Sequence, residues 1–356
     1  MKIDIHCHAI GKGTDFTKTD TEVYFNAEDN QHWFTRILYN VLESGLAKTG
    51  GDSNNDNMIS TDEYFALLYK LFVSSKETEG IVLLALDAVY KDGAADEIKT
   101  DLWVSNTFLA GRVKQLNSQL LKEKQPKKRN KRFYLGASVN PNGPKALEEL
   151  EKAISNPDTV LIKWIPSAQH IHVPAVNDDF YLMMKKGKMP LLCHVGPEYS
   201  FPEGIRNKAE DDFRNLRRPL DMGVKVIAAH CASPVFPLKD PNEMADFYKL
   251  MKEYNTTDDV RLWADTSALS LSTRLPFIKE ILDTFPAKWL VHGTDFPIPI
   301  DGWPHLPFVT EGITPEEYID ICKTKNPFDR DVKIKRAHGF ADSILENAEK
   351  VLRMPS

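Results

Sequence analysis

KIDIHCH, residues 2–8, is the stretch on which the fold prediction depends, because it joins a short apolar strand pattern to two histidines. In a β-strand, side chains two positions apart point to the same side, so His6 and His8 can converge while Cys7 faces away. Neutral imidazole binds borderline metals such as zinc. A His-x-His pair can also be purely structural, so its meaning depends on the rest of the chain.

Outward from this stretch, short apolar runs alternate with amphipathic stretches along most of the 356 residues. This alternation is typical of β/α units around a parallel sheet, and eight such runs predict one α/β domain, residues 1–356, folded as a (β/α)8 TIM barrel. Helices are predicted over residues 148–154 and 244–254, and a closing helix over 334–353. The strand-like runs are residues 2–6, 80–86, 132–139, 159–165, 189–195, 225–230, 260–266 and 288–294.

Three further polar residues stand at the ends of predicted strands. His194 ends the fifth run, His230 ends the sixth, and Asp295 follows the eighth. Barrel enzymes collect their catalytic groups at the carboxyl ends of strands, where core packing does not explain polar side chains. Together with His6 and His8, these residues predict a divalent metal site with an open coordination position.

With these motifs the sequence resembles the amidohydrolase superfamily, and within it the amidohydrolase 2 branch of metal-dependent barrel hydrolases and decarboxylases. The resemblance covers residues 1–10 and about 80–356, and none of its motifs selects a substrate. The motifs are DIHCH (4–8), LLCHVG (191–196), AAHCAS (228–233) and HGTDFP (292–297).

Lys163, at the end of the fourth run, leaves two interpretations open. Binuclear members of the superfamily carry a lysine here that is converted to a carbamate bridging two metals. In that case the resemblance implies a ligand set of His6, His8, Lys163, His194, His230 and Asp295. In the other case the amine pairs with Asp295 or with a substrate carboxylate, and one metal is held by His6, His8, His194 and Asp295.

The predicted reaction is hydrolysis of a small-molecule substrate. A divalent metal, zinc first among the candidates, lowers the pKa of bound water from about 15.7 to near 7. The resulting hydroxide would attack a carbonyl centre (amide, lactone or ester) or a phosphoryl centre, with Asp295 as proton shuttle. His230 either binds a second metal or polarises the substrate. Candidate substrate contacts are His170, Glu198 and Arg274, and the guanidinium of Arg274 suits a carboxylate.

Two rival functions stay open. A metal-dependent decarboxylase of the same branch would use the same ligands without net hydrolysis, and one metal per chain with a substrate-binding arginine would favour it. The second rival is a non-catalytic calcium-binding protein, which the carboxylate beside four histidines disfavours.

A helical insertion is predicted over residues 11–78, and it leaves the first strand on the active-site face just beyond His8. Within it, DSNNDNMISTDE (52–63) follows the twelve-residue EF-hand loop, whose oxygens wrap one Ca²⁺. Position 6, usually glycine, is Asn57, a residue that tolerates positive φ better than most. We expect a structural calcium clamp; the alternative is a polar surface turn. The predicted ligands are Asp52, Asn54, Asp56, Met58 through its carbonyl, Ser60 and Glu63.

The composition predicts a cytoplasmic protein. The net charge of −6 argues against nucleic acid or an anionic membrane as a partner. No apolar run approaches the roughly 20 residues of a membrane span, and MKIDIHCHAI lacks the pattern of a signal peptide. Four cysteines do not make a disulfide framework. Homo-oligomerisation stays open.

Overall fold

Each of the eight apolar runs overlaps a strand of one parallel sheet in the computed structural model, which describes residues 1–26, 46, 59–201, 207–298 and 312–355. The strands lie side by side in chain order. Backbone hydrogen bonds from Ile5 to His292 (3.1 Å) and from His8 to Phe296 (2.7 Å) close the last strand against the first. The predicted TIM barrel is therefore confirmed. Its strands are β1 (Ile3–His8), β3 (Gly80–Leu84), β7 (Arg132–Ala137), β8 (Thr159–Trp164), β9 (Leu191–Cys193), β10 (Val226–Ala228), β11 (Leu262–Asp265) and β12 (Leu290–Val291).

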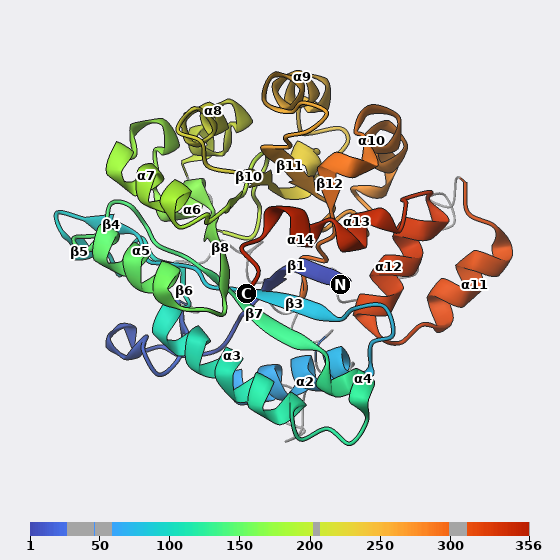
Figure 1. The fold of residues 1–356 in the computed structure, drawn as a ribbon, viewed down its shortest axis with the longest axis horizontal. Coiled ribbons are helices and arrows are strands. Elements are labelled where there is room, and N and C mark those ends of the chain that lie inside the picture. Colours follow the sequence, from blue (N-terminus) through green and yellow to red (C-terminus); the bar gives the residue numbers. More distant parts are fainter. Residues whose placement is uncertain (27–45, 47–58, 202–206, 299–311, 356) are drawn as a thin grey trace.

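Helices surround the barrel as an outer ring (Figure 1). A large apolar cluster fills the layer between strands and helices, as expected for a parallel sheet covered by helices. Two predicted helices are confirmed, since α5 includes residues 148–154 and α9 spans the predicted 244–254. Around the barrel, in chain order, lie α3 (Asn106–Leu120), α4 (Pro126–Arg129), α5 (Ala146–Ser155), α6 (Pro166–Gln169), α7 (Asp178–Lys186), α8 (Arg217–Asp221), α9 (Met244–Tyr254), α10 (Ile278–Thr284) and α11 (Pro315–Lys323).

The predicted closing helix over 334–353 is wrong as one element. The chain forms α12 (Pro327–Ala337), α13 (Ser343–Glu346) and α14 (Ala348–Val351) instead. Gly339, with φ of 101°, adopts a left-handed conformation that ends the first of these helices. The apolar residues of this stretch are buried in two different places. Those of α12 pack in the outer layer, and α14 contributes Val351 to the core inside the barrel.

The amino-terminal end of the barrel is closed by the chain termini. Ala348 and Val351 of α14 pack against the barrel interior, and the backbone N–H of Arg353 donates to the carbonyl of Val160 (3.1 Å). The first amino group pairs with Glu349 at 3.0 Å. The opposite, carboxyl-terminal end is therefore the one available for a site.

Part of the insertion after β1 is described. This part contains the helix α2 (Thr61–Ser74), which begins with a capping box between Ser60 and Glu63. Two short ribbons, β2 (Tyr24–Phe25) with β6 (Leu102–Trp103) and β4 (Tyr90–Lys91) with β5 (Ala94–Ala95), lie beyond the ends of β1 and β3. Four of the predicted calcium ligands lie outside the described residues: Asp52, Asn54, Asp56 and Met58.

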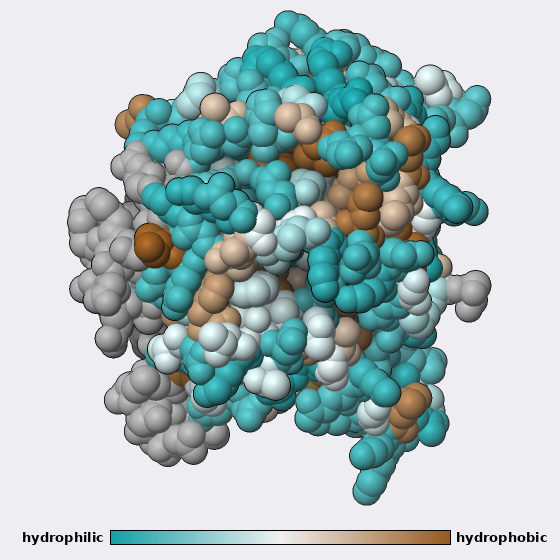
Figure 2. Space-filling model, turned by 90° about the vertical axis from the view of Figure 1, so that its left-hand side faces the viewer, coloured by the Kyte–Doolittle hydropathy of each residue, from teal (hydrophilic) through white to brown (hydrophobic). Residues whose placement is uncertain are grey.

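The molecular face in Figure 2 is mainly hydrophilic, with apolar residues in small groups. Among the described helices, none combines the length and the apolar character that crossing a bilayer requires.

Candidate metal centre

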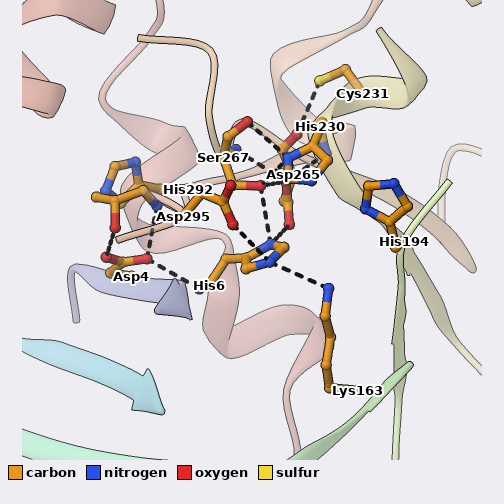
Figure 3. Close-up of polar contacts among 12 residues, drawn as sticks. Asp4, His6, Lys163, His194, His230, Cys231, Asp265, Ser267, His292 and Asp295 are labelled. Atoms are coloured by element: carbon orange, nitrogen blue, oxygen red, sulfur yellow. Dashed lines mark hydrogen bonds and ion pairs between the residues drawn. The ribbon is translucent and has the colours of Figure 1, made fainter. Parts of the chain in front are cut away.

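The predicted ligands gather at the carboxyl-terminal ends of the barrel strands (Figure 3). This is the end of a β/α barrel at which catalytic groups are found. The set comprises His6 and His8 on β1, Lys163 on β8, His194 directly after β9, His230 after β10 and Asp295 after β12.

A register shift in β1 turns both of its histidines toward the site. Ile5 packs inside the barrel, whereas Cys7 packs in the outer layer, although both have odd numbers. The pairing of β1 with β3 shifts by one residue between Asp4 and Cys7, and such a bulge re-aims the side chains that follow it. His6 and His8 therefore share a side, as predicted, and Cys7 faces away from it.

Three donor atoms form a nearly equilateral triangle. The Nε2 atoms of His6 and His8 are 3.2 Å apart, and Oδ1 of Asp295 lies 3.2 Å from the first and 3.1 Å from the second. Donors bound at about 2.1 Å to one ion, at tetrahedral or octahedral angles, are separated by roughly 3.0–3.4 Å. The spacing of this triangle is thus that of three ligands on one metal.

Two further histidines continue the cluster, with the His230 ring centroid 5.3 Å from that of His6 and the His194 ring centroid 5.2 Å from that of His230. Nε2 of His194 is buried and has no hydrogen-bond partner among the described residues, while its Nδ1 lies 3.5 Å from Glu198. A buried polar atom without a partner costs free energy and calls for an explanation such as an ion. His230, together with His6 and Asp295, forms a group whose ligand atoms all lie within 4.8 Å of one another. The donor set therefore fits a divalent cation.

Lys163 is brought into the cluster. Its side chain is 1% exposed, and Nζ lies 3.3 Å from Nε2 of His6. Burial lowers the pKa of the amine, which favours its neutral form. A neutral amine is the form that reacts with CO₂, and it can still donate a hydrogen bond to a carboxylate, so both interpretations of this residue persist.

Burial keeps the imidazoles of His6, His194 and His230 neutral, while the carboxylate of Asp295 stays charged. Burial lowers the pKa of His194 to about 4 and holds those of His6 and His230 well below their usual value. Burial opposes ionisation of Asp295, but its interactions with His6 and His8 outweigh this and lower its pKa. At neutral pH these side chains are in the protonation states that metal ligation needs.

The three predicted substrate contacts lie in different surroundings. Glu198 is buried and faces His194. Arg274 is also buried; its Nη1 donates to the hydroxyl of Ser233 (2.9 Å), and its Nε has no partner among the described residues. His170 lies at the end of α6, where its contacts include a hydrogen bond to its carbonyl from Asn142, in the segment after β7.

Sequence reasoning missed Asp265, the last residue of β11. Its side chain is fully buried, and Oδ2 accepts a hydrogen bond from Nδ1 of His6 at 2.7 Å. The rule that identified His194 and His230, a polar residue at the end of a strand run, would have found Asp265 in VRLWADT as well.

Solved structures that cover nearly the whole chain have low identity to it. A protein from Acinetobacter baumannii assigned as a 2-pyrone-4,6-dicarboxylic acid hydrolase, with citric acid bound, is 14% identical over 99% of both chains, with a TM-score of 0.46. A dihydroxybenzoic acid decarboxylase from Polaromonas with bound manganese is 13% identical over 95% of this chain and 96% of its own, with a TM-score of 0.40. A 4-oxalomesaconate hydratase from Rhodopseudomonas palustris is 17% identical over 98% and 99%, with a TM-score of 0.44.

None of the curated proteins matches this sequence. The model of the family described as amidohydrolase matches residues 94–327, well over half of the chain. That span contains the strand ends that carry Lys163, His194, His230 and Asp295. The protein therefore belongs to the amidohydrolase family of enzymes.

Proposed function

We propose that the protein is a metal-dependent hydrolase whose water nucleophile is activated between His6, His8 and Asp295. The observation that carries this proposal is the donor triangle with sides of 3.1–3.2 Å, beside the unpartnered Nε2 of His194. Buried polar atoms are usually paired, and this cluster leaves Nε2 of His194 without a partner among the described residues.

The metal would be held by His6, His8, His194 and Asp295. Zinc suits this set of three imidazoles and a carboxylate. When bound, such an ion makes water nucleophilic near neutral pH and polarises the bond under attack. We propose a second ion, between Lys163 and His230, only for the carbamate form of the lysine, in which Nζ bonds to the carbon of CO₂ and releases a proton.

Asp295 would handle the proton. Its carboxylate is ionised at neutral pH and touches both histidines of β1, so it lies where the attacking water loses its proton. It would take that proton on one oxygen and pass it to the leaving group, which completes hydrolysis without a further residue.

Arg274 would orient an anionic substrate. Its guanidinium is buried, and charge attraction links it to Asp295 and Glu198 of the same site. A buried cation with an unused N–H suits a carboxylate or phosphate group. Glu198, by contrast, faces His194, and we propose that it orients this ring rather than contacting the substrate.

The test combines metal analysis with one substitution. We expect at least one transition-metal ion per chain and hydrolysis of some member of an ester, lactone, amide and phosphoester panel. Asp295→Asn should keep the fold and lose about 10²-fold or more in kcat. Asp283→Asn, at an exposed carboxylate of α10, is the matched control and should leave the rate unchanged.

Other results would redirect the proposal. Full activity in Asp295→Asn would remove this residue as proton shuttle. One ion per chain, a free Lys163 amine and release of CO₂ from an aromatic carboxylate would favour the decarboxylase reaction instead. Metal-free protein with full activity would end the metal-dependent assignment.

We also propose a structural calcium ion in the loop 52–63, on the strength of its EF-hand spacing. Glu63 would be its last ligand, and it now bonds to the N–H and hydroxyl of Ser60 (3.0 and 2.8 Å). Glu63→Gln keeps this cap but removes the charge, so calorimetry should show loss of calcium binding with helix α2 intact. Wild-type protein that binds no calcium would refute the proposal.

A further inference from the structure

Asp265 lies between His6, a proposed ligand of the metal, and His230, a proposed ligand of the conditional second ion, and it contacts both residues (Figure 3). Its Oδ2 accepts the hydrogen bond from Nδ1 of His6, at 2.7 Å. Its Oδ1 accepts from the backbone N–H of His230 (2.8 Å), from the backbone N–H of Ser267 (3.0 Å) and from the hydroxyl of Ser267. The two backbone N–H groups are fixed in direction, so they hold the carboxylate in one arrangement.

The hydroxyl of Ser267 extends this arrangement to a second ring. Because its proton points to Asp265, its oxygen is left to accept, and Nδ1 of His230 lies 2.8 Å away. The carbonyl of Ser267 is a second acceptor for the same nitrogen, at 3.1 Å. These two acceptors favour a proton on Nδ1 of His230, as the carboxylate of Asp265 does for Nδ1 of His6.

A neutral imidazole has one N–H, so a proton on Nδ1 leaves a lone pair on Nε2. In both rings Nε2 is the nitrogen turned away from Asp265. In His6 it is the atom that faces His8 and Asp295. One carboxylate thus determines which nitrogen two different strands present to the site.

We propose that Asp265 is a positioning residue that fixes the tautomers of His6 directly and of His230 through Ser267. This role rests on the proposed function, because it concerns nitrogens that would bind the metal. It goes beyond that function because β11 supplies none of the proposed ligands, yet it would control one ligand of the metal, His6, and the ligand of the conditional second ion, His230.

The substitution Asp265→Asn tests the assignment sharply. Three donors converge on the Oδ1 side, so the amide oxygen must stay there and the NH₂ group must face His6. His6 must then accept on Nδ1 and carry its proton on Nε2, where it blocks the site. Asp265→Ala leaves room for water and lets His6 populate both tautomers.

The readouts are two-bond ¹H–¹⁵N correlation spectra of the metal-free protein, zinc affinity from chelator competition, and urea unfolding. We expect Nδ1–H in both rings of the wild type, and Nε2–H at His6 in Asp265→Asn with zinc affinity reduced about 10- to 100-fold. Asp265→Ala should bind zinc better than Asp265→Asn although it is less stable. If Asp265 served only the fold, zinc affinity would follow stability, and Asp265→Ala would bind zinc more weakly than Asp265→Asn.

Asp329→Asn is the matched control. Asp329, in α12, is another buried carboxylate, and it accepts from the backbone N–H groups of Lys76 and Glu77, just after α2. It should cost stability without moving either tautomer. Wild-type His6 with its proton on Nε2, or Asp265→Asn with unchanged zinc affinity, would overturn the proposal. Failure of the wild type to bind zinc would instead end the proposed function, while the spectra would still decide the tautomers.

Discussion

His194 shows how a single residue reports on a site. One ring nitrogen faces Glu198 and the other is buried without a partner among the described residues. Leaving such an atom unpaired costs about 1–3 kcal/mol, which a bound ion or substrate would recover. His194 therefore lowers the stability of the fold without a ligand, and it contributes binding free energy when an ion or substrate pairs with its Nε2.

Asp101 is a second residue of this kind, away from the predicted ligands. Its side chain is 3% exposed, both carboxylate oxygens lack partners among the described residues, and burial raises its pKa to about 7. The folded state therefore keeps a proton that the unfolded state releases near pH 4. Its contribution to stability is lost as the pH rises from about 4 through about 7.

We predict that Asp101→Asn gains stability over the wild type as the pH rises. Since the amide cannot ionise, the gain at pH 8 should exceed the gain at pH 5 by about 2 kcal/mol. Urea unfolding at the two pH values measures it. Asp92→Asn, at an exposed carboxylate of a nearby turn, should show no such trend, and a gain that does not depend on pH would contradict the prediction.

At the scale of elements, the site depends on how closely β12 approaches β1. A Cβ added to Gly293 would lie 2.7 Å from Cβ of His6 and 3.2 Å from Cβ of Ser267. Only glycine therefore allows the last strand to carry Asp295 to the histidines of the first. The glycine of HGTD is explained by this contact between elements.

Helix α12 holds the same strand end from outside. Nζ of Lys335 is buried and donates to the carbonyl of Gly293 (2.7 Å) and to Asp331, one turn earlier in the helix (2.6 Å). A buried ion pair that loses one partner leaves an uncompensated charge.

We predict that Lys335→Met lowers the free energy of unfolding by about 3–5 kcal/mol, because Asp331 remains buried without its cation. The double variant Asp331→Leu/Lys335→Met should recover much of this loss. Lys279→Met on α10 is the control, since Lys279 forms an exposed pair of the same length with Asp283 and should cost less than about 1 kcal/mol. Equal losses at the two lysines in urea unfolding would show that burial is not the cause.

For the whole molecule, the two ends of the barrel have different tasks. α14 and the chain termini pack into the amino-terminal end, so that end contributes stability. At the carboxyl-terminal end, histidines and carboxylates are buried at a cost in free energy. Only a bound metal ion or substrate offsets that cost. Metal binding should therefore be visible in the stability of the entire fold.

We predict that removal of metal by a chelator lowers the melting temperature by roughly 5–10 °C and that added zinc restores it. A ligand present at 1,000 times its dissociation constant stabilises the folded state by about 4 kcal/mol. Differential scanning fluorimetry measures the shift. His8→Ala lacks one side of the donor triangle, and its melting temperature should respond little; an equal response would place the ion elsewhere.

The order of the eight strands and the rim positions of His6, His8, His194, His230 and Asp295 could be predicted from the sequence, because apolar runs and their polar ends are local patterns. The closing helix could not, since residues 334–353 keep a helical spacing across a break at Gly339. The sequence determined which residues reach one end of the barrel. Only the tertiary structure decided how they meet: the shifted register of β1, the approach of Gly293 and the two-ring contact of Asp265 join strands far apart in the chain, and such distances are set by packing rather than by local preference.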